Sequence, residues 1–191
     1  MNRRKAIYRI TIAGLGIAVG GTAYKWWTLA RRPDLDYVRQ HTQLIAALCE
    51  TIIPASDTPG ANDAKVQDFI LKMIRDCTPR KDQNNFISGL ESIQSHCRRA
   101  YGREYEHCTP SEQAAALALY EDRGKPYKGV AGKIEARLLG RSFFAILKDY
   151  TIQGYCTSQV GATKGLAYAY IPGSFNPCIP LQKGQKAWAT N

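Results

Sequence analysis

The sequence lacks the short motifs that mark most catalytic and cofactor sites. It contains no G-x-S-x-G nucleophile motif, no P-loop and no H-E-x-x-H zinc motif. Histidine is scarce as well, and the three that occur share no spacing typical of metal ligands: His41, His96 and His107. These absences argue against an enzyme that acts alone.

Cysteine is present but never in C-x-x-C spacing, which argues against zinc sites, a dithiol redox motif and covalent haem attachment. An even number of cysteines predicts disulfides in an exported chain. Six cysteines allow fifteen connectivities, among which the sequence cannot choose. The local pairs are Cys97 with Cys108 and Cys156 with Cys178, and the pair that remains is Cys49 with Cys77.

Acidic residues are absent from positions 1–32, which hold seven of the 26 lysines and arginines. Arg3 and Arg4 precede a charge-free stretch from Ile10 to Tyr24. A positive head followed by a short apolar run is typical of an export signal, and the arginine pair favours the twin-arginine route, which carries folded proteins. We therefore interpret residues 1–32 as a twin-arginine-type signal or anchor and expect a periplasmic protein. A general secretory signal is the alternative.

The fate of this segment stays open. Gly21-Thr22-Ala23 offers an A-x-A-like arrangement for cleavage after Ala23. The charge-free stretch would rise only about 22 Å as a helix, short of the ~30 Å hydrocarbon core. A helix that continued to Ala30 would span the cytoplasmic membrane, with Trp26 and Trp27 at the interface.

The charge of the remaining chain is nearly balanced, with 19 basic and 16 acidic residues after position 32. Such a surface has no electrostatic footprint for phosphate backbones, so we expect no nucleic-acid partner. By its length, the segment 33–191 is one domain with a single core.

Apolar residues recur at helical spacing in five segments, so the fold class is all-α. The expected helices cover about 34–53, 66–74, 82–101, the segment after Thr109, and about 129–153. Thr109-Pro110-Ser111-Glu112 is a capping box with proline at the first helical position, and Gly154 is the expected C-cap of the last helix. Residues 168–180 are rich in Gly and Pro and predict an irregular C-terminal arm pinned by a disulfide of Cys178.

Two loop motifs stand out. They are E-T-I-I-P-A-S-D-T-P-G at 50–60, and L-K-D-Y-T-I-Q-G-Y-C-T-S-Q-V-G-A-T at 147–163 with I-P-G-S-F-N-P-C-I-P at 171–180. We expect Asp57 to bond to its own turn or to cap the next helix, in preference to a catalytic role. Four aromatic residues either pack a local core or form a contact surface: Tyr155, Tyr168, Tyr170 and Phe175.

With these motifs the chain resembles the gluconate 2-dehydrogenase subunit 3 family over about residues 44–181. The resemblance rests on the order I-I-P-A-x-D-T-P-G, a helix, G-Y-x-T-S-x-V-G-A-T and a late P-G. Cys156 and Gln159 depart from the family pattern, in which an aromatic and an acidic residue are common there. The family's partner interface is therefore not transferred in detail.

The resemblance implies a non-catalytic accessory subunit of a membrane-associated, flavin-dependent sugar or sugar-acid dehydrogenase. FAD would belong to a separate, larger flavoprotein subunit and haem c to a further carrier, a cytochrome c, with no cofactor in this chain. The chain would bind the flavoprotein, support its maturation and supply the export signal. The competing class is a stand-alone envelope redox or binding protein with an unrecognised site. The candidate interface residues are Pro54, Asp57, Thr58, Pro59, Gly60, Tyr155, Tyr168, Tyr170 and Phe175.

Overall fold

The computed structural model describes residues 31–125 and 139–171, and positions 173, 178, 180–181 and 183–189 of the C-terminal arm. The export-signal prediction with Arg3 and Arg4, and the candidate interface residue Phe175, lie outside the described residues. Within the described part the chain is helical, and its only strand-like pairing is an isolated bridge between Ala167 and Trp188. The predicted all-α fold is confirmed. None of the described helices is both long and apolar enough to cross a bilayer.

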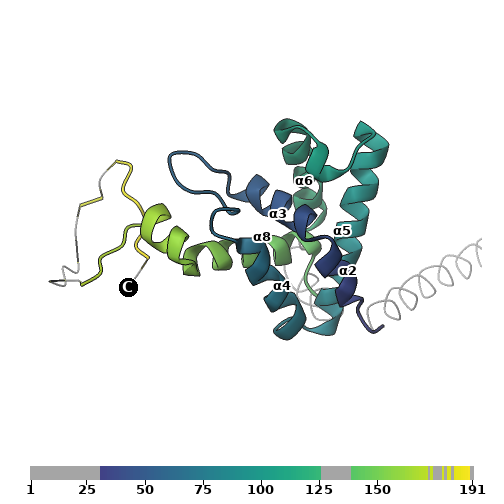
Figure 1. Cartoon of the computed structure of the whole chain (residues 1–191), viewed down its shortest axis with the longest axis horizontal. Helices are drawn as coiled ribbons and strands as arrows, with labels where there is room; N and C mark the ends of the chain where they lie inside the picture. The colour runs from purple at the N-terminus through teal and green to yellow at the C-terminus, as the bar shows by residue number, and fades with distance from the viewer. Residues whose placement is uncertain are drawn as a thin grey trace, which may run out of the picture.

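Helix α8 occupies the middle of the bundle. The helix contacts α3, α4, α5 and α6, and its far end protrudes toward the arm (Figure 1). In chain order the helices are α2 (Leu35–Gln40), α3 (Thr42–Ile52), α4 (Val66–Asp76), α5 (Arg80–Tyr101), the 3-10 turn η1 (Tyr105–His107), α6 (Pro110–Arg123), α8 (Phe143–Thr157) and the π-helical turn η2 (Gly161–Gly165).

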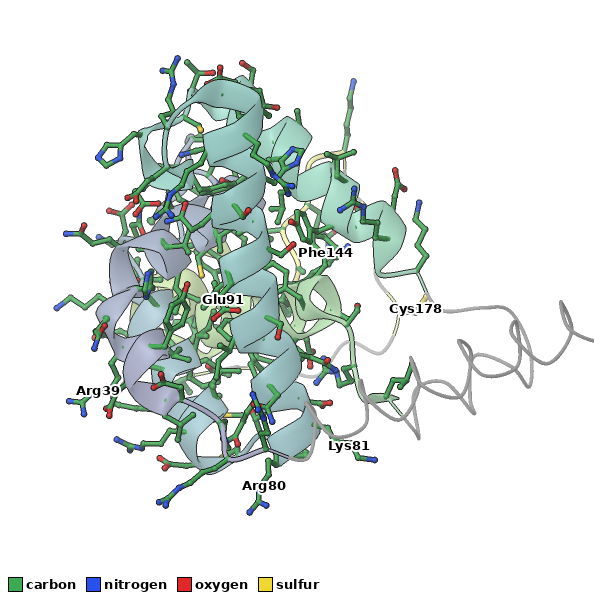
Figure 2. The ribbon with its side chains drawn as sticks, turned by 90° about the vertical axis from the view of Figure 1, so that its right-hand side faces the viewer. Arg39, Arg80, Lys81, Glu91, Phe144 and Cys178 are labelled. Carbon is green, nitrogen blue, oxygen red and sulfur yellow. The ribbon has the colours of Figure 1, made fainter. Side chains whose placement is uncertain are left out.

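The core forms where α5, α6 and α8 converge on Phe143. The ring of Phe143 lies 5.5 Å from that of Phe86 in α5 and 5.9 Å from that of Tyr120 in α6, between ring centroids. Gly89 of α5 lies directly against Phe143, whose side chain occupies the space that a Cβ atom at position 89 would need. Figure 2 shows α5 running along the bundle, with Arg80 and Lys81 of its first turn at one end. A small residue in α5 therefore sets how closely α8 can approach.

The expected first helix, 34–53, is broken at His41. The backbone of His41 leaves the helical region (φ −100°, ψ 31°). Its N–H and its Nδ1 both contact the Tyr37 carbonyl, at 3.2 and 2.9 Å, and its ring stacks on that of Tyr37. The local bonds satisfy the end of α2, so α3 begins anew at Thr42.

Two predicted helix ends are confirmed. Helix α6 starts with the full capping box, in which Thr109 Oγ1 and the Glu112 carboxylate each accept a bond from the other residue's backbone N–H. Helix α5 ends at Gly102, whose φ of 69° lies in the left-handed region that favours glycine.

The predicted end of the last helix is wrong. Gly154 is not a C-cap, because α8 continues to Thr157. Gly154 is buried within the helix, and a Cβ atom there would meet Phe69 and Val66 of α4 at 2.8 and 3.1 Å. The glycine serves helix packing instead of helix termination.

The start of α8 also differs from the expected helix at about 129–153. Residues 126–138 lie outside the described part, and the chain is non-helical at 140–142. Asp82 of α5 accepts the Arg141 N–H at 2.9 Å, and Asn85 donates to the carbonyls of Leu139 and Arg141. These bonds hold the turn that aims α8 into the core.

We predict that Gly89→Ala destabilises the protein by about 1–3 kcal/mol, because the Phe143 ring must move out of a packed core. The gain in helix propensity, up to ~1 kcal/mol, opposes this loss only in part. Urea unfolding of the purified chain measures the difference. Ser88→Ala, on the exposed side of α5, is the matched control and should change stability little. Equal stability of the two variants would contradict the packing argument.

Candidate partner interface

The two loop motifs lie against each other, although they are far apart in the sequence. Tyr155, near the end of α8, donates its hydroxyl to the Pro59 carbonyl at 2.7 Å, across 96 positions. Figure 1 shows the loop between α3 and α4, the far end of α8 and the arm on the same side of the molecule. We call the surface formed by residues 54–60, 156–171, 181 and 183–189 the motif face.

The side chain of Glu50, in α3, fixes the loop 54–60. Its carboxylate accepts the Ala55 N–H and the Asn62 N–H, each at 2.9 Å, and so ties the two ends of the loop to α3. The Ala61 N–H donates to the Ile53 carbonyl at 3.0 Å and closes the base. At Gly60 a Cβ atom would collide with the Glu50 carboxylate and the Ala55 nitrogen. The loop is thus exposed but held in one shape.

Asp57 does not play the predicted capping role. It accepts a bond from the neighbouring Ser56 hydroxyl at 2.9 Å, and its side chain is exposed. Helix α4 begins only at Val66, after Lys65 in the left-handed region (φ 53°), and no side chain caps it. The Gly60 N–H is accepted by Asp63 at 3.0 Å. The capping alternative is wrong because a further turn separates Asp57 from the helix, whereas the bond from Ser56 lies within the turn of Asp57 itself.

The G-Y-x-T-S-x-V-G-A-T motif builds a tight reversal after α8. The Ser158 hydroxyl donates to the Tyr155 carbonyl at 2.8 Å and accepts the Gly161 N–H at 2.9 Å. A Cβ atom at Gly161 would meet the Tyr155 carbonyl, and one at Gly165 would meet the Tyr155 hydroxyl. The two glycines therefore allow η2 to wrap around Tyr155. This reversal leads the chain into the arm.

The C-terminal end of the arm lies beside its start. The Ala167 N–H donates to the Ala187 carbonyl at 2.8 Å, and the Ala189 N–H donates to the Ala167 carbonyl at 2.9 Å. Lys186 Nζ donates to the Lys164 carbonyl at 2.9 Å. Both ends of the arm are therefore fixed beside η2.

The arm carries large apolar side chains in solvent. Tyr170, Ile171 and Leu181 are 85, 78 and 88 % exposed, and Trp188 is about half exposed. The last 42 residues, 150–191, contain three lysines and no acidic residue. The arm therefore offers apolar side chains on a weakly cationic segment.

The described members of the predicted interface fall into three groups by exposure. Pro54, Asp57, Tyr168 and Tyr170 are exposed, and Thr58 and Pro59 are half-buried. Gly60 and Tyr155 are buried, so in this chain they lie beneath the surface and support it. Sequence reasoning missed three exposed side chains, for which the signal was large apolar residues in a segment that forms no helix: Ile171, Leu181 and Trp188.

The histidines are not brought together. His41 stacks on Tyr37, His96 packs edge-on against Tyr101, and His107 is exposed in η1. No group of three or more His, Cys, Asp or Glu residues in the described part is arranged to hold a metal ion. All six cysteines are free thiols in this structure, so the disulfides stay a prediction.

We predict that Tyr155→Phe lowers the free energy of unfolding by about 1 kcal/mol, because it removes the bond to Pro59 and leaves that carbonyl without this partner. Amide hydrogen exchange at Ser56 and Ala61 should become faster, since the loop loses its tie to α8. Tyr170→Phe removes an exposed hydroxyl and is the control. Unchanged exchange in the loop of Tyr155→Phe would show that Glu50 alone holds it.

The match to a known family covers both halves of this site. A family model described as gluconate 2-dehydrogenase subunit 3 matches residues 39–173, which include the loop 54–60, the whole of α8 and the first part of the arm. No curated protein and no solved structure matches the chain. The matched region is well over half of the sequence, and the two motifs that the family resemblance rested on pack together through Tyr155 and Pro59. The chain belongs to the gluconate 2-dehydrogenase subunit 3 family.

Proposed function

We propose that this chain is the non-catalytic accessory subunit of a membrane-associated, flavin-dependent sugar or sugar-acid dehydrogenase, and that it binds the flavoprotein subunit through the motif face. The family match supports a dehydrogenase partner. In this proposal FAD resides in the flavoprotein, and haem c resides in a further cytochrome c subunit that accepts the electrons. The observation that carries the proposal is the exposed apolar arm.

The exposed apolar side chains of the arm can contribute binding energy when a partner buries them. Tyr170, Ile171 and Leu181 are each more than three-quarters exposed, so they contribute little to the core of this chain. Complete burial of such a side chain is worth about 1.5–3 kcal/mol. Aromatic and large aliphatic side chains in the desolvated centre of an interface commonly dominate its binding energy. The arm therefore holds enough unburied apolar surface to anchor a protein partner.

The hydrogen bonds that fix the loop 54–60 and the two ends of the arm favour binding as well. Tyr155 and Glu50 fix the loop 54–60, and the two ends of the arm are tied beside η2. A surface that is already ordered loses less conformational entropy when it binds. We infer that the partner contacts the loop and the arm together, with Asp57 and Pro54 at the rim.

The proposal also assigns the export of the flavoprotein to this chain. Arg3 and Arg4 precede an apolar stretch typical of the twin-arginine route, which accepts folded proteins. A cofactor-containing partner must fold around FAD before it is exported. One signal can serve both subunits if the complex forms in the cytoplasm. The complex would then work in the periplasm, at the membrane if the N-terminal segment is retained.

The stand-alone alternative needs a ligand site in this chain. A groove of about 290 Å³ between α2 and α4 is one hollow that could hold such a site. Its lining includes Val38, Leu71 and Ile74, and Arg39 extends from its edge into solvent (Figure 2). Asp68 is the only acidic residue that lines it, so it holds no pair of carboxylates for acid–base chemistry. The accessory role is therefore the better-supported function.

We predict that Tyr170→Ser combined with Ile171→Ser weakens binding of the flavoprotein roughly 10–100-fold, because two interface anchors are lost. The melting temperature of the chain alone should stay the same, since both side chains are exposed. Co-purification from cells and titration of the isolated subunits measure the effect. Leu119→Ser, an exposed leucine on α6, is the control. Loss of binding in the control alone would place the interface on α6.

We predict that Arg3→Lys combined with Arg4→Lys retains both subunits in the cytoplasm while the complex still forms. The substitution keeps the charge but removes the arginine pair, and it lies outside the folded body. Cell fractionation with antibodies to both proteins gives the distribution. Lys5→Arg keeps the pair and should be exported normally. Normal export of the flavoprotein in the double-lysine variant would refute the escort role.

A further inference from the structure

Two of the six cysteines meet beside η1. Cys97 is fully buried near the end of α5, and Cys108 follows η1 with 7 % of its surface exposed. Cys108 Sγ donates to the Glu104 carbonyl at 3.3 Å, and Tyr105 and Glu106 of η1 both bond to Gln94, one turn before Cys97 in α5. A disulfide requires side chains at short range. The fold brings these two buried thiols to one junction.

The junction is built into the fold. The Gln94 side chain accepts the Tyr105 N–H and donates to the Glu106 carboxylate, each at 2.9 Å. Arg98 forms an ion pair with Glu104 at 2.6 Å. These bonds tie η1 to α5 on both sides of Cys97, so the segment that carries Cys108 is held in place.

We propose that Cys97 and Cys108 form an intramolecular disulfide when the protein meets a disulfide oxidant. The Cys108 thiolate attacks the oxidant's disulfide and releases one thiol. Cys97 then attacks the mixed disulfide, forms the Cys97–Cys108 bond and releases the second thiol. Two electrons and two protons pass from the cysteine pair to the oxidant, whose own S–S bond is broken. Bridging in the cell rests on the proposed export, whereas the pairing itself does not.

The surroundings set the order and the rate of these steps. Burial raises the pKa of Cys97 to about 12, and it also raises the pKa of Cys108. Cys108 is the more accessible thiol, so it is the one that reaches an external disulfide. Thiolate is the reacting form, and the reaction of the folded protein should accelerate as the pH rises from 7 to 9.

The other cysteines have different surroundings. Cys49 is buried, and its Sγ accepts a hydrogen bond from the Thr151 hydroxyl at 3.5 Å. Cys77 and Cys178 are exposed, and Cys156 is half-buried. Like Cys97 and Cys108, each of these four is a free thiol in this structure. What distinguishes the Cys97–Cys108 pair is that both thiols are buried where η1 is bonded to α5.

The bridge would strengthen a junction of three helices. It encloses Tyr105, whose side chain is fully buried. The Tyr105 hydroxyl donates to Thr51 of α3 at 2.9 Å, and the Tyr105 carbonyl accepts from the Gln113 side chain of α6 at 2.9 Å. Closing the short loop restricts the unfolded chain and stabilises the folded one.

The experiment uses the full-length chain, purified in reductant and then oxidised with glutathione disulfide. Free thiols are blocked and the protein is digested with trypsin, which cuts between the two cysteines after Arg98, Arg99 and Arg103. We expect peptides 82–98 and 104–123 to travel as one linked species that separates on reduction. The melting temperature should fall by roughly 5–10 °C when the oxidised protein is reduced.

Two variants test the assignment. Cys77→Ser should form the same linked species. Cys108→Ala should lose it, and its melting temperature should no longer respond to reductant. The proposal is overturned if complete oxidation leaves Cys108 as a glutathione mixed disulfide with Cys97 free, or links Cys97 elsewhere. If the bridge forms in vitro but protein from the envelope has both thiols free, the export reading fails and the pairing stands.

Discussion

The hydrogen bond from Tyr155 to the Pro59 carbonyl is the constraint on which the motif face depends. The far end of α8 leaves the bundle and has α4 as its main helical neighbour, so it cannot be fixed by packing on all sides. Gly154 lets α8 approach Phe69 closely, and Tyr155 then reaches across to the loop. Two glycines of η2 fold around the same tyrosine. The arm begins where that wrapping ends, and one buried phenol therefore positions both parts of the face.

Stability and binding are assigned to different parts of the chain. Helix α8 packs among four helices, and its first half carries the core through the buried side chains of Phe143, Ile146 and Leu147. The arm exposes large apolar residues that the core does not use. A fold that needed those residues for its own core could not offer them to a partner. The hydrogen bond from Tyr155 to Pro59 fixes the base of this face, while the apolar side chains of the arm stay in solvent.

The sequence predicts those features that depend on nearby residues. The capping box at Thr109 and the glycine after α5 are local signals, and both helix ends lie where they indicate. The errors arise where distant residues decide. Gly154 resembles a helix end until Phe69 of α4 is seen against it. Likewise, the motif at 54–60 indicates where the site lies, but the burial of Gly60 depends on Glu50, and no periodicity reveals that contact.

Charge has a secondary part in this surface. The segment from 150 onward has three lysines and no acidic residue, but Lys186 uses its ammonium group to hold the arm to the Lys164 carbonyl. Lysines in solvent lose most of their attraction beyond about one Debye length, ~8 Å at physiological salt. In the proposed complex the binding energy would therefore come chiefly from the apolar side chains, while the cations would favour a partner surface with an acidic rim. Charge then sets the orientation of docking, because rim charges affect the encounter more than they affect the final affinity.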